Sequence, residues 1–331
     1  MRGLVRSARL LAPLLLAWAC ASPIPARAQS LSPADKKAGT QTLTVGPSQA
    51  YALPSDAARA AKPGDTIRIF PGTYTDCAVL DVDGLVIEGA GPNVVLQGKV
   101  CNGKGIFVTA GNDITIRNIT FTSARAPDHN GAGIRSEGAN LTVEDSRFIG
   151  NEEGILTASN AASRILIKNS IFRGNGNCIA ACAHGIYAGH IALLRVENCK
   201  FEEQHVGHHI KSRAARTEII NNSVQDGPDG SASYLVDLPN GGSALISGNV
   251  FEKGPHSGNR QTAIAIGAEQ ETNQAGGIIV QDNSFSNDTG IATTFVRNYT
   301  GRPIVVVRNH LPGNVTPLGA APPSQTDKTP P

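Results

Sequence analysis

The sequence of 331 residues is poor in charged and aromatic side chains, which make up 17% and 5% of it. Its one Met and one Trp, Met1 and Trp18, lie near the N-terminus. Helical 3.6-residue periodicity is nearly absent, and no stretch after the N-terminal segment approaches the roughly 20 apolar residues that span a bilayer. Beyond residue 28 the chain has 25 basic and 27 acidic residues. This balance excludes a nucleic-acid or membrane-surface partner held by bulk charge.

Glycine and apolar residues are plentiful instead. The chain has 36 Gly, and 40% of its residues are hydrophobic. This composition allows a sizeable core and argues against general disorder. Without a collagen period, the glycines are expected to serve turns.

The N-terminus has the layout of a secretory signal peptide. Three Arg precede an apolar run from Leu10 to Ala19, and Ala26-Arg27-Ala28 supplies small residues for cleavage. We therefore expect residues 1–28 to be removed and the mature protein to be soluble, either secreted or periplasmic. Cys20 leaves open a lipoprotein interpretation, although Ala17-Trp18-Ala19 is a poor match to such sites.

A short unit recurs along the chain: Asn or Asp, two further residues, then Phe. The clear copies begin at Asn118, Asp145, Asn169, Asn198 and Asp282, with degenerate copies at Asn221, Gly248 and Arg308. An alternating apolar strand such as Ile114-Thr115-Ile116 precedes each copy, and a second short strand such as Gly133-Ile134-Arg135 lies upstream. Units this short bury their apolar faces only by stacking, with equivalent positions about 4.8 Å apart. The recurring Asn is expected to form a ladder of amide hydrogen bonds.

The repeat resembles that of the right-handed parallel β-helix superfamily, the pectate-lyase-like fold, over about residues 40–315. The stretches Gly64-Asp65-Thr66-Ile67 and Pro71-Gly72-Thr73-Tyr74 resemble its first coil, and Pro54 to Ala61 resembles the short helix that caps its open end. The expected fold class is all-β, a right-handed parallel β-helix solenoid with a short N-terminal capping helix. The expected organisation is a signal peptide (1–28), a linker (29–42), the β-helix domain (43–315) and a disordered Pro-rich tail (316–331).

Five Cys follow the leader, and an exported chain favours disulfides. The expected pairs are Cys77–Cys101, about one repeat apart, and Cys178–Cys182, with Cys199 left as a buried thiol. A zinc site built from Cys178, Cys182, His184 and His190 is the alternative.

One block of the chain departs from the Thr, Ser, Asn and Gly found on most outward positions. Aligning the upstream strands places five apolar residues in one inward column: Ile134, Ile155, Ile186, Ile210 and Val236. Strand alternation then sends their neighbours Arg135, Tyr187, Lys211 and Asp237 outward on one face. His209 and Arg213 are expected beside Lys211, because positions two apart share a face. The alternative is that the Lys and Arg form an ordinary solvated face.

These side chains suit β-elimination in a polyuronate, which needs a cation on the carboxylate and a base for the adjacent proton. Arg213 suits the carboxylate, Lys211 is the candidate base, and Tyr187, His208 or His209 can return a proton to the leaving oxygen. The resemblance implies a Lys or Arg base on this face, often with Ca²⁺, for which Asp237 is the candidate ligand.

Further candidates are expected to bind substrate around this centre. They are Arg135, Glu137, His184, His190, Asp237, Asn240 and Glu269, with the loop Asp128-His129-Asn130 nearby. Four insertions are the candidate groove walls: residues 173–184, 225–233, 252–262 and 267–277.

The expected function is therefore that of an exported polysaccharide lyase acting on an acidic, uronate-containing polymer. A polygalacturonase-like hydrolase using Asp237 and Glu269 is one alternative, although no adjacent Asp pair occurs. A C5-epimerase, which starts with the same proton abstraction, and a non-catalytic polysaccharide binder or adhesin are the others. The expected partner is the polysaccharide, without nucleic acid, and the chain is expected to be a monomer.

Overall fold

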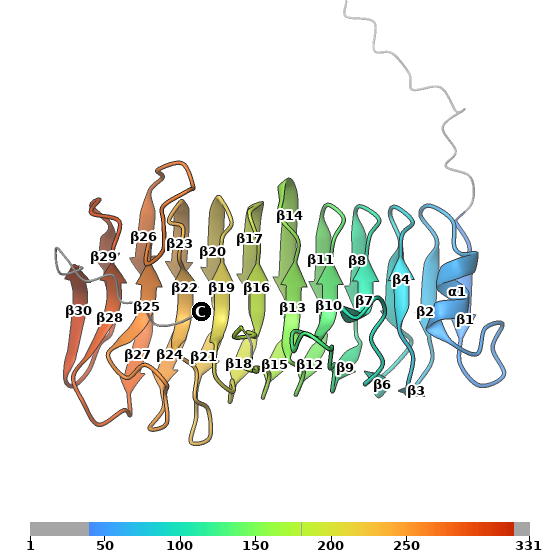
Figure 1. Cartoon of the computed structure of the whole chain (residues 1–331), viewed down its shortest axis with the longest axis horizontal. Helices are drawn as coiled ribbons and strands as arrows, with labels where there is room; N and C mark the ends of the chain where they lie inside the picture. The colour runs from blue at the N-terminus through green and yellow to red at the C-terminus, as the bar shows by residue number, and fades with distance from the viewer. Residues whose placement is uncertain (1–39, 180, 321–331) are drawn as a thin grey trace, which may run out of the picture. The chain divides into compact units, whose positions relative to one another are not determined.

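The computed structural model describes residues 40–179 and 181–320. The predicted signal peptide and most of the linker lie outside these residues, as does the end of the tail. Within the described part, the chain winds through three parallel sheets, named A, B and C, and each full coil adds one strand to each sheet in that order. In Figure 1 the coils follow one another from the blue N-terminal end to the red C-terminal end. The expected all-β parallel solenoid is confirmed, with three strands in a full coil.

The strands of each sheet are parallel and follow chain order. Sheet A contains β1 (Thr42–Val45), β2 (Thr66–Ile69), β5 (Val86–Gly89), β8 (Ile114–Arg117), β11 (Leu141–Glu144), β14 (Asn160–Lys168), β17 (Ile191–Glu197), β20 (Arg216–Ile220), β23 (Ser243–Ser247), β26 (Ile278–Gln281) and β29 (Val305–Val307). Sheet B contains β3 (Gly72–Tyr74), β6 (Val94–Gln97), β9 (Thr120–Thr122), β12 (Arg147–Ile149), β15 (Ile171–Arg173), β18 (Lys200–Glu202), β21 (Ser223–Gln225), β24 (Val250–Lys253) and β27 (Ser284–Asn287). Sheet C contains β4 (Ala78–Leu80), β7 (Gly105–Thr109), β10 (Ala132–Ser136), β13 (Glu153–Thr157), β16 (Ile186–Ala188), β19 (His208–Ser212), β22 (Tyr234–Leu238), β25 (Thr262–Ile266), β28 (Thr293–Asn298) and β30 (Val315–Ala320).

Both ends of the solenoid have defined elements. Helix α1 (Pro54–Ala60) buries Ala57 and Ala58 against the first coil, as the sequence predicts. Strand β30 continues to Ala320, so the solenoid runs five residues past the expected boundary at 315. The correction has a simple cause: residues 316–320 pair with β28, which extends sheet C into the Pro-rich segment.

The recurring Phe residues form the centre of the core. Phe121, Phe148, Phe172 and Phe201 stack in successive coils with ring centroids 4.6–5.2 Å apart. All four are essentially inaccessible to solvent. Full burial of each such ring contributes roughly 1.5–3 kcal/mol, so the Phe of the sequence unit is the main apolar ladder.

A polar ladder runs parallel to the Phe stack. The Oδ1 atoms of Asn249 and Asn283 accept the backbone N–H of Asn222 and Asn249, at 2.8 and 2.9 Å. An amide ladder therefore exists in the C-terminal coils, one position after the residue that begins the unit. In the earlier units this position is Ile119, Ser146, Ser170 or Cys199. The beginning residue itself has a left-handed backbone, as at Asn221 with φ of 55°, because it makes the turn between sheets A and B.

The cysteines pair as the sequence predicts. Cys77–Cys101 and Cys178–Cys182 are disulfides, and Cys199 is a buried free thiol. Burial raises the pKa of Cys199 to about 12. Among the described residues, no helix has the length and apolar character needed to cross a membrane.

Candidate functional site

Tyr187, Lys211 and Asp237 project from three adjacent strands of sheet C. Tyr187 pairs with Lys211 across β16 and β19, and Lys211 pairs with Asp237 across β19 and β22. The same column continues through Leu156 to Arg135 in β10. The register inferred from the inward Ile residues is therefore correct.

His209 is not part of this outward face, and its expected position there is wrong. Its ring is buried, with Nε2 2.9 Å from Oδ1 of Asp226. The residue before the aligned apolar residue is buried in sheet C as well, so two successive residues, His209 and Ile210, point inward. The three preceding coils have Gly at this position: a Cβ at Gly154 would lie only 2.8 Å from the ring of Phe172.

His208 takes the outward place instead, in a second column with His184 and Tyr234. The backbone N–H of His208 donates to Nδ1 of His184, and the N–H of Tyr234 donates to Nδ1 of His208, at 3.0 and 3.2 Å. Burial and the nearby Lys211 lower the pKa of both imidazoles well below 6.5. Each ring is therefore neutral with its proton on Nε2, a donor directed away from the backbone.

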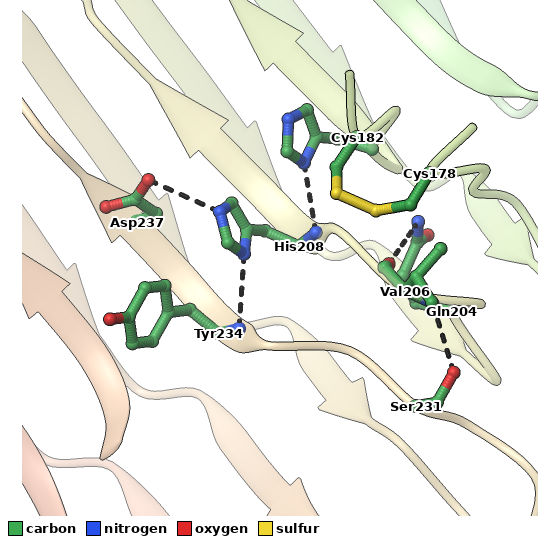
Figure 2. The surroundings of a disulfide bond; sticks show 9 residues. Cys178, Cys182, Gln204, Val206, His208, Ser231, Tyr234 and Asp237 are labelled. Atoms are coloured by element: carbon green, nitrogen blue, oxygen red, sulfur yellow. Dashed lines mark hydrogen bonds and ion pairs between the residues drawn. A yellow bond between two sulfur atoms is a disulfide. The ribbon is translucent and has the colours of Figure 1, made fainter. Parts of the chain in front are cut away.

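Asp237 lies beside the Nε2 of His208. Its Oδ2 is 3.5 Å from this nitrogen (Figure 2). The same oxygen is 3.7 Å from Nζ of Lys211. Its Oδ1 is buried without a hydrogen-bond partner among the described residues. Burial raises the pKa of Asp237 to about 6, and Glu269 adds to the shift while Lys211 opposes it. This carboxyl group can therefore hold or release a proton near neutral pH.

Glu269 binds the two cations of the site together. Arg213 contacts both of its oxygens, at 3.0 and 2.7 Å, and Nζ of Lys211 lies 3.2 Å away. Burial alone would raise the pKa of Glu269, but these hydrogen bonds lower it. Glu269 is therefore an anion that holds the side chains of Lys211 and Arg213 together.

Arg213 is held by two further side chains. Its Nε donates to the Tyr187 hydroxyl at 2.9 Å, and its Nη1 donates to Oδ1 of Asn240 at 2.6 Å. Asn240 is buried and lines neither cavity described below, so it positions the guanidinium. Although burial opposes it, hydrogen bonding to Glu269 and Tyr187 raises the pKa of Arg213 above its usual value.

These side chains line a cavity of about 580 Å³, here called the main cavity. Its ionisable and aromatic lining residues are His184, Tyr187, His208, Lys211, Arg213, Tyr234, Asp237 and Glu269. All four predicted insertions contribute to its wall, through Cys178, Ala181 and Cys182, through Ser231 and Ser233, through Gly258, and through Ala268 and Glu269. In Figure 2 the Cys178–Cys182 disulfide lies beside the strand that carries His208.

A second cavity of about 550 Å³ adjoins the first, here called the second cavity. Tyr187, Arg213, Ala181 and Cys182 line both. Its remaining lining residues include Asp128, Asn130, Arg135, Glu153, Thr157, Ser159 and His190. The predicted substrate residues Arg135 and His190 therefore lie here rather than at the main cavity.

Two residues are misplaced or missed by sequence reasoning. Glu137 lines neither cavity, because its carboxylate pairs with Lys104 and lies 3.6 Å from Nε of Arg135. Glu153 lines the second cavity and was missed. It occupies the same outward column as His184, so aligning the residue before each Gly-Ile pair would have found it.

The acidic residues do not form a calcium site. Lys211 Nζ lies within 4 Å of both Asp237 and Glu269, so an ammonium group occupies the space that a shared cation would need. Within residues 40–179 and 181–320, no group of three or more His, Cys, Asp or Glu has the arrangement of metal ligands. The sulfurs of the alternative zinc site, Cys178 and Cys182, are bonded to each other.

Known proteins share this fold. The family described as "Right handed beta helix region" matches residues 72–224. ORF18 of Geobacillus virus E2 has a TM-score of 0.52 and 13% identity; the match covers 80% of this chain, which spans 56% of the viral protein. Pectate lyase Pel9A has a TM-score of 0.52 and 18% identity, covering 86% of this chain and 79% of the lyase. A rice weevil pectin methyl esterase has a TM-score of 0.46 and 11% identity, and the match covers 82% of this chain and 86% of the esterase.

No curated protein sequence matches the chain. The chain therefore has the parallel β-helix fold, and the family match over residues 72–224 indicates no subfamily. At these identities the likeness to the solved structures concerns the fold alone.

Proposed function

We propose that the protein is an exported polysaccharide lyase that cleaves a uronate-containing polymer by β-elimination. One observation carries the proposal: Asp237, with a free Oδ1, lies beside Lys211 and close to the Arg213–Tyr187 pair. Pel9A is by its name a pectate lyase, but the proposal for this chain depends on its own side chains. The two disulfides support export, because such bonds persist in oxidising compartments.

Lys211 is proposed as the cation that neutralises the sugar carboxylate, rather than as the base. The carboxylates of Glu269 and Asp237 lie 3.2 and 3.7 Å from its Nζ and hold it at the wall of the main cavity. Lowering negative charge on the substrate carboxylate makes the adjacent C–H more acidic. Arg213 adds a second positive charge within the same cavity.

Asp237 is proposed as the base. Its pKa of about 6 leaves it mainly ionised at neutral pH, close to the range in which proton transfer is most effective. The Nε2–H of His208 and the ammonium of Lys211 lie on its Oδ2 side, so the unpartnered Oδ1 is left to accept a proton.

Tyr187 is proposed as the acid. Its oxygen accepts a hydrogen bond from Arg213, which leaves its own O–H available for the leaving oxygen. Asp237 takes the proton from C5, the electron pair forms the C4=C5 bond, and the C4–O bond breaks as Tyr187 protonates the departing oxygen. The products are an unsaturated uronate and a new sugar hydroxyl, and later proton exchange with water restores both residues.

A glycoside hydrolase is the second candidate, because the environments of Asp237 and Glu269 shift their pKa values in opposite directions. Asp237 is then suited to donate a proton, and Glu269 is suited to act as an anion. Both carboxylates contact Lys211, so their nearest oxygens are at most 6.9 Å apart.

Ultraviolet absorbance separates these functions. The protein is incubated with polygalacturonate, alginate and glucuronan, with and without Ca²⁺, while absorbance and reducing ends are followed. A lyase produces both signals, because the new C=C bond is conjugated with the carboxylate, and Asp237→Asn abolishes them. Reducing ends without absorbance would establish hydrolysis and overturn elimination.

A third readout covers the remaining alternatives. Uptake of solvent deuterium at C5 without cleavage would identify an epimerase, and an unchanged polymer would favour a binder. The Glu269→Gln variant distinguishes the two proposed enzymes. A lyase should retain turnover in this variant, while a hydrolase should lose it.

A further inference from the structure

The second cavity contains two buried polar atoms that lack hydrogen-bond partners. One is Nε of Arg135 and the other is Oε2 of Glu153. The Glu153 side chain is only 2% exposed. Among the described residues, few buried side-chain atoms are left in this state, and two of them line the same cavity. Because an unpaired buried polar atom costs about 1–3 kcal/mol, Oε2 of Glu153 is suited to pair with a ligand. Nε of Arg135 makes only an ion pair with Glu137, at 3.6 Å, and can still donate a hydrogen bond to a ligand.

The chemistry of the two groups is complementary to an anion. Arg135 supplies fixed N–H donors that match a carboxylate. Burial raises the pKa of Glu153 well above its usual range, which favours the protonated carboxyl group with an O–H to donate. The hydroxyls of Thr157 and Ser159 line the same cavity and suit a sugar.

We propose that the second cavity is a carboxylate-binding subsite, in which Arg135 and Glu153 hold an acidic sugar remote from the bond that is cleaved. The identification of the ligand as a uronate rests on the proposed function. Arg135 lies three strands from Lys211 in one column, through Leu156 and Tyr187, which corresponds to about 14 Å. The bound polymer therefore runs along the solenoid axis, and only chains long enough to reach Arg135 bind with full affinity.

Calorimetric titration with oligogalacturonates and oligomannuronates, from disaccharides to octasaccharides, tests the subsite. The Asp237→Asn variant is used so that the ligands are not cleaved. Affinity is expected to rise once the oligomer reaches the second cavity. Adding Arg135→Gln should reduce the affinity for long oligomers about 10-fold or more, while the affinity for short ones is unchanged.

Two further substitutions control for indirect effects. Arg297→Gln changes an Arg of the same outward column, on the other side of Asp237, that lines neither cavity, and should leave all affinities unchanged. Glu153→Gln retains a neutral donor and should keep affinity within about twofold, whereas Glu153→Leu should lose about 10-fold. Thermal unfolding of each variant verifies that the fold persists.

The outcomes separate this inference from the proposed function. Binding that depends on Arg135 without turnover of any polymer would support the subsite and overturn the lyase. Turnover with affinities insensitive to Arg135 and Glu153 would overturn the subsite and leave the lyase in place. Absence of binding by every oligomer would also overturn the subsite.

Discussion

Asp237 lies between groups that shift its protonation in opposite directions. Burial and Glu269 raise its pKa, while Lys211 and Arg213 lower it. A base in the proposed reaction must be ionised, so its pKa sets the acidic side of the pH–rate profile. The net result of about 6 places that limit just below neutrality.

Two substitutions should move this limit in opposite directions. In the wild type, kcat/KM should fall about tenfold per pH unit below pH 6. Lys211→Met removes a neighbouring cation and should raise the pKa of Asp237 by about one unit, and Glu269→Gln should lower it by a similar amount. Measured pH profiles of kcat/KM check both shifts, with Lys211→Met also losing rate at every pH.

The control is Asp282→Asn, which removes an exposed carboxylate paired with Arg308, outside both cavities. It should leave the acidic limit in place. Shifts of the two test variants in the same direction would contradict the assignment of Asp237 as the base.

At the residue scale, the positions of Tyr187, Lys211 and Asp237 could be predicted from the sequence, because their column follows directly from the aligned inward residues. The position of His209 could not be predicted in this way. Strict alternation of strand residues fails where two successive residues are buried, and the Gly residues of the preceding coils are the signal of that exception. The carboxyl pKa values and the partners of Arg213 depend on loop residues such as Glu269, whose approach no periodicity describes.

At the scale of elements, the Asn ladder links sheets A and B along the stack. The side-chain amide of Asn249 donates to the backbone oxygen of Ile219, and its Oδ1 accepts from Asn222. The side chain is 1% exposed, so water cannot replace these bonds. A single Asn therefore satisfies the backbone of a neighbouring coil.

Asn249→Ala should lower the free energy of unfolding by about 2–4 kcal/mol, because it leaves at least two buried polar groups unpaired. Urea denaturation followed by circular dichroism measures the loss. Asn221→Gly is the matched control: Asn221 is exposed and has φ of 55°, a conformation that Gly adopts freely. Equal losses in the two variants would show that the ladder contributes nothing specific.

The strands and disulfides were predictable for related reasons. A ladder needs the same residue type at the same place in every coil, so Ile, Phe and Asn recur in the sequence. Cys77 and Cys101 are one coil apart, which places them side by side. Strand β30 could not be predicted because its segment lacks the recurring unit. The segment also contains Pro, so its composition resembles that of a disordered tail.

At the scale of the whole solenoid, helix α1 covers the first coil. Ala57 is fully buried between the helix and the stack, whereas Ala60 is exposed on the same helix. The helix hides apolar residues and strand edges that would otherwise pair with another molecule.

Ala57→Glu should displace this cap, because it places a carboxylate in an apolar contact. We expect self-association detected by light scattering and a lower thermal midpoint. Ala60→Glu, the same substitution on the exposed face of the helix, should leave the protein unchanged. Self-association of both variants to the same extent would attribute the effect to charge rather than to loss of the cap.

The unbroken register of sheet C has a consequence for how this protein can diversify. Every coil advances the outward face by one strand spacing, so the separation between Arg135 and Lys211 is a whole number of coils. Duplicating or deleting one coil between them would change that separation by a single step and leave each group intact. The distance between the two groups can therefore change only in steps of one strand spacing. Duplication or deletion of a gene segment that encodes one repeat would change it by one such step.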